Sequence, residues 1–349
     1  PATTLSTFTI GFTEKSFDES AQSQRVADHF GTRHFVKIAD QASCDQVLQA
    51  LRVTDEPFAD SSILPMCLLT SFAREHVTVC LSGDGADELF GGYETYAADT
   101  LCRAVSFLPQ GGFSVLGLLL RRFWPISYAK VSFDYKLKQF IDGCSLGDPL
   151  KAHLFWRGIF TPAQIHDLLV DPDAPTDKEL DAFCYAQPFA KKVEKASYLD
   201  QVMYFDQKIY MPDDILTKVD RAAMAHSLEV RAPFLDHRIV EFAAGLPVSW
   251  KVQGMQKKRF LRATQQGTVP DKSLNQKKQG FGAPVSLWLR SILRDCARDV
   301  TSSRELLPWF RQETILRFWK EHEEGCEDHG LRLFGLLCLG LWMDRMRSL

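Results

Sequence analysis

The 349-residue chain lacks the long apolar run that a membrane protein would show. Its longest apolar stretches, residues 115–120 and 334–342, are well short of the roughly 18 residues that a membrane-spanning helix needs. Nothing in the sequence resembles a signal peptide. We therefore expect a cytoplasmic protein with no membrane partner.

A strong charge of one sign is also missing. The net charge is only -3, so the whole molecule has no field that would gather nucleic acid, and any phosphate-binding site must be local. The nine cysteines are an odd number without a Cys-x-x-Cys pair, which argues against a disulfide framework and a zinc knuckle. We expect buried, reduced thiols and no nucleic-acid partner.

What is present is the ordinary composition of a soluble globular protein, with 45% hydrophobic and 24% charged residues. The length suffices for about two domains. The chain opens at Pro1 rather than at methionine. We expect a processed product or a piece of a longer protein.

The first 95 residues alternate between strand and helix patterns. The predicted elements, in order, are a strand at 5–12, a helix at 19–30 capped by Asp18, a strand at 33–38, helices at 44–53 and 65–74, and a strand at 77–81. This alternation predicts a parallel sheet, and its short apolar strands suit a sheet covered on both faces.

After about residue 95, helical spacing prevails and convincing strand runs disappear. The clearest helical segments are residues 135–141, 154–160, 163–169 and 178–185. The expected organisation is therefore an α/β part over residues 1–100 and a mainly helical part over 101–349.

The stretch Ser82–Glu88, which reads Ser-Gly-Asp-Gly-Ala-Asp-Glu, directly follows an apolar strand. Ligands bind at this position in open parallel sheets, and Gly83 lets the backbone approach a ligand closely. Carboxylates would repel a bare phosphate, so Asp84 and Asp87 suggest a bound Mg²⁺ ion. The alternative is that both carboxylates only complement the start of a helix.

A second cluster combines opposite charges with the apolar sequence Pro-Phe-Leu. Arg221, Glu229, Arg231 and Asp236 lie close together in the chain, which predicts paired ions at a buried boundary. A structural network and an active-site role both remain open, with Glu229 the strongest functional candidate.

A third cluster is basic. The sequences "GMQKKRFLR" (254–262) and "NQKKQGFGAP" (275–284) place lysines beside glycine-containing turns. Lysine binds phosphate as a point charge, although a lysine pair is also typical of a solvated face.

The motifs "LSGDGADELFGGY", "KVDRAAMAHSLEVRAPFLDHRIVEF", "QKKRFLR" and "KKQGFGAP" occur in this order along the chain. In sequence and order they resemble the synthetase domain of glutamine-dependent asparagine synthetases. The shorter sequences "TFTIGF", "DES" and "DEPFADSS" fit the same pattern.

This resemblance implies one domain over residues 1–349, with a parallel sheet of the adenine-nucleotide α-hydrolase (PP-loop) type that binds ATP and Mg²⁺. It also implies a ligase that adenylates a carboxylate, most simply aspartate, and releases pyrophosphate. Ammonia from glutamine then attacks the acyl-AMP and forms an amide, here asparagine. A homodimer is a further expectation.

The resemblance assigns roles by matching position. The implied site consists of Asp87 as the Mg²⁺ ligand, Ile10, Ser82 and Gly83 near the nucleotide, Lys258 beside the reacting phosphate, Lys278 as a phosphate contact, and Asp84 and Glu229 as active-site acids. The role implied for Lys258 is electrostatic stabilisation of the transition state.

Two departures from the family pattern affect the expected function. The family's Ser-Gly-Gly-x-Asp-Ser pyrophosphate loop would precede "TFTIGF", and its glutaminase domain would precede that loop; this chain starts after both. We expect a fragment that is inactive alone and whose parent chain supplies the glutaminase domain.

The second departure is Asp84, where asparagine synthetases tend to carry glutamate. It leaves open a related amidotransferase that acts on another carboxylate in natural-product, peptide or surface-polysaccharide biosynthesis. A non-catalytic scaffold is the third alternative.

Overall fold

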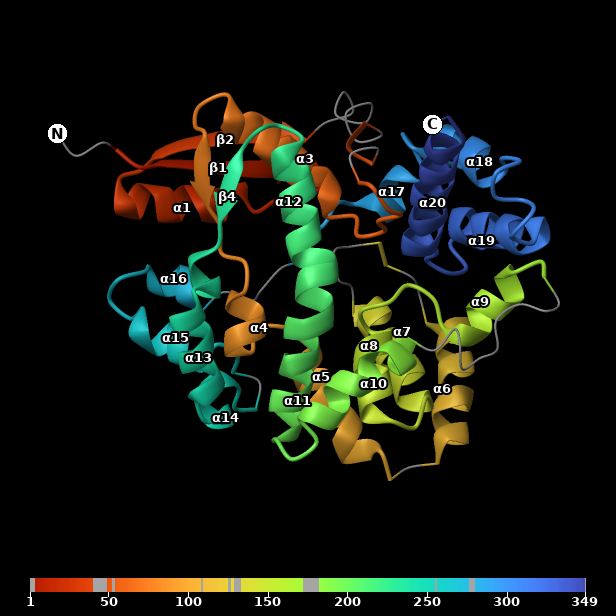
Figure 1. The fold of residues 1–349 in the computed structure, drawn as a ribbon. Helices are drawn as coiled ribbons and strands as arrows, with labels where there is room; N and C mark the ends of the chain where they lie inside the picture. The colour runs from red at the N-terminus through yellow and green to blue at the C-terminus, as the bar shows by residue number, and fades with distance from the viewer. Residues whose placement is uncertain are drawn as a thin grey trace. The chain divides into compact units, whose positions relative to one another are not determined.

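The computed structural model describes residues 4–39, 49–51, 54–107, 109–124, 127–128, 133–171, 182–254, 256–275 and 280–348. The chain divides into two compact units, and neither is a continuous stretch of sequence (Figure 1). Unit 1 comprises Pro1–Val53, Ser62–Tyr96 and Ser197–Ala283. Unit 2 comprises Thr54–Ser61, Ala97–Ala196 and Pro284–Leu349.

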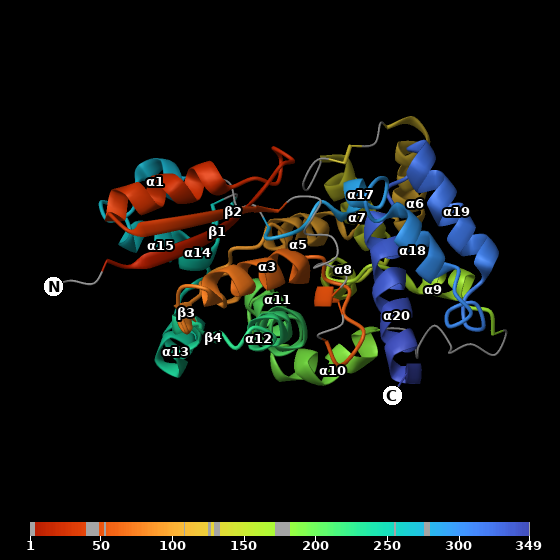
Figure 2. The same cartoon turned by 90° about the horizontal axis from the view of Figure 1, so that it is seen from above.

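In unit 1, strands β1 (Ser6–Phe12) and β2 (Arg33–Ala39) pair in parallel. Helices α1 (Ser20–Phe30) and α3 (Ile63–Arg74) lie on opposite sides of this pair (Figure 2). The predicted strands, parallel pairing and helices are confirmed here, but the described strands form two separate two-stranded sheets rather than one, and Val36 and Ile38 of β2 are exposed, so the expectation of one sheet covered on both faces was wrong. The helix predicted at 44–53 lies mostly outside the described residues.

The cap predicted for α1 was wrong in its position, because Glu19 is the N-cap residue and makes no side-chain cap hydrogen bond, although Asp18 still contacts the first residue of the helix. The Asp18 carboxylate accepts hydrogen bonds from the Ser20 backbone N–H at 3.1 Å and from the Ser20 hydroxyl at 2.9 Å. The first of these bonds satisfies one backbone donor that the first turn of a helix leaves unpaired. The loop from β1 therefore enters α1 in a defined direction.

A second parallel pair in unit 1 joins β3 (Val79–Leu81) to β4 (Glu229–Arg231). The expectation that strands end after residue 95 was therefore wrong. The reason is that β4 has only three residues, two of them charged and exposed, so it forms no apolar run.

The other elements of unit 1 are mainly helices. They are α4 (Ala86–Phe90), α11 (Tyr198–Phe205), the π-helix η1 (Asp206–Leu216), α12 (Thr217–Met224), the 3₁₀ turn η2 (Pro233–Leu235), α13 (His237–Gly245), α14 (Val248–Lys251), α15 (Arg259–Thr264) and α16 (Asp271–Leu274). Helices α11, η1 and α12 follow one another without interruption, as the long green rod of Figure 1 shows. Helix α5 (Thr95–Val105) begins at the end of a unit 1 segment and continues into unit 2.

Pro212 lies inside η1 and provides a local reason for the wider helix. Proline has no backbone N–H to donate and its ring crowds the preceding turn of an α-helix. The Thr217 hydroxyl donates to the Pro212 carbonyl oxygen at 2.9 Å. π-Helical turns occur often at functional sites, which directs attention to the residues that η1 carries.

The described part of unit 2 is built from helices. They are α6 (Gln110–Phe123), α7 (Phe133–Ser145), α8 (Pro149–Phe155), α9 (Pro162–Leu168), α10 (Ala182–Lys192), α17 (Val285–Trp288), α18 (Arg294–Thr301), α19 (Gln312–Glu324) and α20 (Gly330–Ser348). The buried side chains of Trp319, Leu333, Phe334 and Leu337 belong to its core.

Three of the predicted helical segments in unit 2 overlap observed helices, and the fourth, 154–160, was mostly wrong. Helix α8 starts earlier than predicted, at Pro149, and ends at Phe155. At its start, the Asp148 side chain accepts a hydrogen bond from the backbone N–H of Leu150 at 2.8 Å. Proline at the first helical position and aspartate before it are a strong start signal that apolar spacing alone does not reveal.

Within the described ranges, no helix has both the length and the apolar character that crossing a membrane requires. Eight cysteines lie in these ranges and all are free thiols. Cys184 and Cys326 are exposed, so the expectation that every thiol is buried was wrong. Cys44 lies outside the described residues.

Candidate active site

The turn from β3 to α4 places the Ser82–Glu88 stretch at the carboxyl end of a parallel pair. The Ser82 backbone N–H donates to the Arg231 carbonyl oxygen at 2.9 Å, directly after the last paired residues. Gly85 has φ +87°, and a Cβ there would lie 2.2 Å from Leu235 Cδ2. Only glycine fits both the conformation and the space, so the chain can pass from strand to helix within four residues.

The three carboxylates of this stretch occupy different environments. Asp87 faces Lys258, whose Nζ lies 2.9 Å from Asp87 Oδ1. Glu88 is buried at 1% exposure, whereas Asp84 is half-buried. The negative charge of this stretch is thus balanced by a lysine at Asp87 and is partly solvated at Asp84.

Lys258 reaches Asp87 from an unusual backbone conformation. Its φ is +52°, in the left-handed region, immediately before α15 begins at Arg259. Non-glycine residues pay an energetic cost there, and such residues cluster at functional sites. The neighbouring Lys257 lies 3.9 Å from Glu94 instead, so the two adjacent lysines serve different carboxylates.

Gly92 is packed directly against the Asp87–Lys258 pair. A Cβ at this position would lie 1.7 Å from Asp87 Oδ1 and 2.3 Å from Lys258 Cε. The Gly92 backbone N–H also donates to the Asp87 carbonyl oxygen at 2.9 Å. The ion pair therefore occupies the space that any larger residue would need.

The remaining residues predicted near the nucleotide are distributed as follows. Ser82 and Gly83 lie in the turn that precedes Asp87 of α4, and the buried Ser82 hydroxyl has no hydrogen-bond partner among the described residues. Ile10 is buried on β1, in the other strand pair. Lys278 lies outside the described residues.

The ion pairs predicted around β4 are present, but most of their side chains are exposed, so the expected buried boundary was wrong. Glu229 pairs with Arg231 at 2.7 Å, Arg221 with Asp220 at 2.9 Å, and Asp236 with Arg238 at 2.7 Å. Each of these partners is at most two residues away, and the side chains of Arg231 and Arg238 are well exposed, whereas that of Arg221 is half-buried. The active-site role of Glu229 stays a prediction.

Asp236 has a clear local function. It accepts a hydrogen bond from the Arg238 backbone N–H at 3.0 Å and so caps α13. The hydrogen bond from the Arg238 guanidinium, aided by this backbone bond, holds the pKa of Asp236 well below its usual value. A helix cap explains this carboxylate without a ligand.

Sequence reasoning missed a polar group of residues beside Asp87. The Tyr93 hydroxyl donates to Glu88 Oε1 at 2.5 Å, and Gln207 Nε2 of η1 donates to the Glu88 carbonyl oxygen at 3.1 Å. Burial raises the pKa of Glu88, the hydrogen bond from Tyr93 opposes this rise, and the negative charges of Asp87 and Asp206 add to it. The nearest signal in the sequence is the position of Glu88 directly after Asp87.

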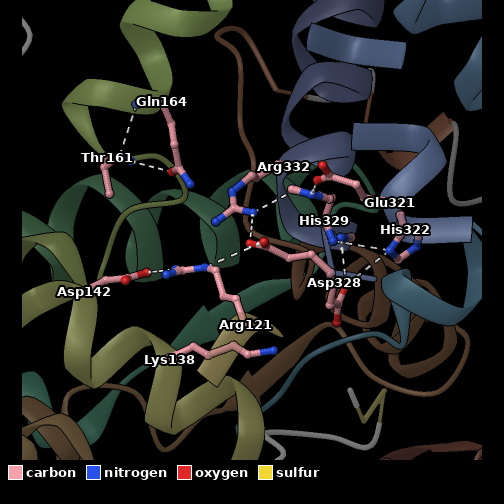
Figure 3. Close-up of polar contacts among 12 residues, drawn as sticks. Arg121, Lys138, Asp142, Thr161, Gln164, Glu321, His322, Asp328, His329 and Arg332 are labelled. Carbon is pink, nitrogen blue, oxygen red and sulfur yellow. Dashed lines mark hydrogen bonds and ion pairs between the residues drawn. The ribbon is translucent and has the colours of Figure 1, made fainter. Parts of the chain in front are cut away.

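A cluster in unit 2 has the residue types of a metal site. Oxygen and nitrogen atoms of Glu321, Glu327 and His329 lie within 4.8 Å of one another. However, Arg332 Nη1 lies 3.0 Å from Glu327 Oε1 and 2.8 Å from His329 Nδ1, as Figure 3 shows for His329 and Arg332. Because a guanidinium already supplies the positive charge, the cluster is explained as a structural network.

Comparison with known proteins places this chain in a family. The family model described as asparagine synthase matches residues 2–344. The glutamine-hydrolyzing asparagine synthetase 1 of Bacillus subtilis (strain 168) is 26% identical over 340 residues, which are 97% of this chain and 52% of that protein. Asparagine synthetase 3 of the same strain is 27% identical over 288 residues, 79% of this chain and 39% of that protein.

A relative with a different name is also found. Amidase chry2 of Gibberella zeae is 23% identical over 305 residues, 80% of this chain and 44% of that protein. The chain thus spans about half the length, or less, of these curated relatives. The match of one family model along nearly the whole chain shows that this protein belongs to the asparagine synthase family.

Proposed function

We propose that this chain is the synthetase part of an ATP-dependent amide-forming ligase. The substrate carboxylate attacks the α-phosphorus of ATP, pyrophosphate leaves, and ammonia then displaces AMP to form the amide. Aspartate, giving asparagine, is the simplest substrate, because the Bacillus subtilis relatives are named asparagine synthetases. The observation that carries the proposal is the Asp87–Lys258 pair at the end of β3.

Lys258 supplies charge to the reacting phosphate. Its ammonium is a compact point charge, and it reaches the site from a strained backbone conformation. Preorganised charges of this kind are commonly the largest contribution to catalysis. Lys258 therefore acts on the transition state more than on substrate binding.

The donor set beside Lys258 fits a magnesium ion. Asp87 and Asp84 offer the hard carboxylate oxygens that Mg²⁺ prefers, and the buried Ser82 hydroxyl, without a partner among the described residues, offers another oxygen in the same turn. Asp87 would hold the ion, with Asp84 as a neighbouring active-site acid. When bound, the ion would neutralise charge on the nucleotide phosphates.

The proposed nucleotide site also includes Gly83 and Ile10, with Lys278 as a phosphate contact and Glu229 as an acid at the carboxylate. We propose a PP-loop-type sheet in the cytoplasm, with ammonia supplied by a glutaminase domain in a longer parent chain. A homodimer is part of the same proposal. The glutamine-hydrolyzing names of the Bacillus subtilis relatives support the ammonia source.

A second candidate is a related amidotransferase with another carboxylate substrate. The shorter Asp84 side chain, together with the relative named Amidase chry2, favours this alternative. ATP–pyrophosphate exchange by the full-length protein, with a panel of carboxylates, separates the two. Exchange that depends on aspartate supports asparagine formation, whereas exchange with a different carboxylate only supports the second candidate.

Nucleotide binding distinguishes the proposed ligase from the third alternative, a scaffold without catalytic activity. The ligase proposal requires the full-length protein to bind ATP in the presence of Mg²⁺, and calorimetric titration measures this binding directly. If the full-length protein neither bound ATP nor catalysed ATP–pyrophosphate exchange, the scaffold would be the remaining interpretation.

A further inference from the structure

Helix α6 of unit 2 is apolar on both of its faces. Its inner face packs on α7 (Figure 1), where a Cβ at the buried Gly117 would lie 3.4 Å from Ile141 Cγ2. Phe113, on the same face, joins the apolar cluster around Cys144 and Ala152. A helix that is apolar all round is typical of a buried position. We therefore expect the outer face of α6 to be covered as well.

The outer face carries four large aliphatic side chains that are open to solvent. Their exposed fractions are 60% for Val115, 45% for Leu116, 69% for Leu118 and 49% for Leu119. Spacings of three and four residues place Val115, Leu118 and Leu119 on one side of the helix, with Leu116 at its margin. We call the surface formed by these four residues the α6 face.

Exposed aromatic side chains flank the α6 face at both ends of the helix. Phe107, three residues before α6, is 80% exposed, and Trp124, directly after it, is 43% exposed. The ring of Trp124 lies 6.1 Å from the ring of Phe133, which is 67% exposed at the start of α7. Aromatic residues are enriched in protein–protein interfaces, so these flanks favour a protein partner.

The exposed area is close to what one partner contributes to a stable dimer. A large apolar residue has a surface of roughly 150–200 Å², so the α6 face and its three aromatic flanks expose on the order of 700 Å². A standard interface buries about 800 Å² per partner, whereas the largest apolar patch of a typical monomer is about 300–600 Å². An exposed apolar surface of this size indicates a docking site.

The charges around the α6 face suit a second copy of the same chain. Residues 110–120 contain no charged residue, so two identical faces can meet without repulsion between like charges. Arg121, at the end of this stretch, is already paired, with its guanidinium 2.5 Å from Asp142 and 3.7 Å from Glu327. A strongly charged partner would therefore find no complementary charge along this stretch.

A lipid surface fits the α6 face less well than a second copy does. Helices that lie on membranes combine an apolar face with basic residues that attract anionic lipid. The stretch 110–120 has no basic residue, and the net charge of -3 gives the chain no general attraction to such a surface. Of these occupants, a second copy is the one that the observations favour.

We propose that the α6 face is the surface through which two copies of this chain associate, with α6 of one copy against α6 of the other across a two-fold axis. In such a contact the same residues of both copies are covered. The homodimer itself rests on the proposed function, whereas the choice of surface rests on the α6 face and requires no catalysis.

Sedimentation velocity of the full-length protein, over a range of concentrations, tests the association. Wild type should sediment as a dimer. Leu118→Glu brings a carboxylate from each copy into the contact and should raise the dimer Kd by about 30-fold or more. The matched control is Leu316→Glu, because Leu316 is 50% exposed on α19, and it should leave the Kd unchanged. A monomeric wild type, or a wild-type Kd in Leu118→Glu, would overturn the proposal.

Hydrogen exchange of wild type locates the surface without any substitution. The backbone amides of residues 110–123 should exchange more slowly at concentrations where the dimer prevails than where the monomer prevails. Unchanged exchange of this helix on dimerisation would assign the interface elsewhere and overturn the proposal. A monomer that binds vesicles of phosphatidylcholine and phosphatidylserine through this helix, or one in which another part of the parent chain protects it, would overturn the proposal too.

The two proposals fail in different ways. If wild type dimerises through the α6 face but shows no ATP–pyrophosphate exchange with any carboxylate, the proposed ligase fails and the assignment of the surface stands. If exchange is found while Leu118→Glu dimerises like wild type, the assignment of the surface fails and the proposed ligase stands.

Discussion

Gly92 shows how a single residue constrains the site. A methyl group there would overlap Asp87 Oδ1 at 1.7 Å, with Lys258 Cε only 2.3 Å away. Gly92→Ala should therefore separate the Asp87–Lys258 pair, lower ATP–pyrophosphate exchange by about 10²-fold and cost about 1–3 kcal/mol of stability. Gly245→Ala, which meets open space, is the control and should leave exchange and the urea midpoint unchanged. Full exchange in Gly92→Ala would show that this contact does not matter.

Asp87 provides a test of charge without a change of shape. Asp87→Asn keeps the size of the side chain and removes the negative charge that faces Lys258 at 2.9 Å. We expect exchange to fall by about 10²–10³-fold while the circular dichroism spectrum is retained. The control is Asp220→Asn, which removes an exposed carboxylate from its pair with Arg221. Near-wild-type exchange by Asp87→Asn would exclude Asp87 from the metal site.

Individual residues were predictable to different degrees. Asp87 and Lys258 could be selected from motifs, and the structure brings them together. Glu88 and Gln207 could not, because their contact depends on how η1 packs against α4. The left-handed backbone conformation of Lys258 was not predictable either, because no feature of the sequence around it indicates a positive φ.

Elements in unit 2 are connected by a network that should respond to pH. His329 Nε2 contacts Glu321 Oε2 of α19 at 2.6 Å, and Arg332 of α20 contacts its Nδ1 (Figure 3). Burial, and secondarily the Arg332 charge, lower the pKa of His329, against the opposing effect of Glu327 and Glu321. The folded state therefore favours the neutral ring, whose Nδ1 accepts from Arg332.

The sign of the resulting pH dependence follows from linkage. Below the ordinary histidine pKa of 6.5, the unfolded chain binds a proton that folded His329 resists, so stability falls as the pH decreases from 6.5 through the lowered folded pKa. The urea midpoint should fall over this range, and His329→Gln should reduce the pH slope. The exposed His237→Gln is the control and should keep it. An unchanged slope in His329→Gln would show that another group controls the transition.

Regular elements with strong local signals were predicted from the sequence. β1 and β2 are rich in β-branched and aromatic residues, and α1 ends at a glycine, Gly31, at φ +63°. β4 and η1 were missed because their conformations depend on partners far away in the chain. β4 exists through its pairing with β3, and η1 depends on how the chain accommodates Pro212 within a helix.

At the scale of the whole molecule, we propose that this chain is the synthetase part of a longer parent protein. It covers 52% of the Bacillus subtilis asparagine synthetase 1, although the family model matches residues 2–344. The proposed activity therefore belongs to the full-length protein, with ammonia supplied outside this chain. Both compact units are assembled from separate segments, so the motifs of unit 1 come from distant parts of the sequence.

The most direct test is ATP–pyrophosphate exchange by the full-length protein with Lys258→Ala and Lys257→Ala. The two lysines are adjacent in sequence, but Lys258 Nζ lies 2.9 Å from Asp87 Oδ1, whereas Lys257 Nζ lies 3.9 Å from Glu94 Oε1. We predict carboxylate-dependent exchange by wild type, a loss of about 10²–10³-fold in kcat with little change in KM for Lys258→Ala, and retained exchange for Lys257→Ala. A wild-type kcat in Lys258→Ala would contradict the proposed adenylation site.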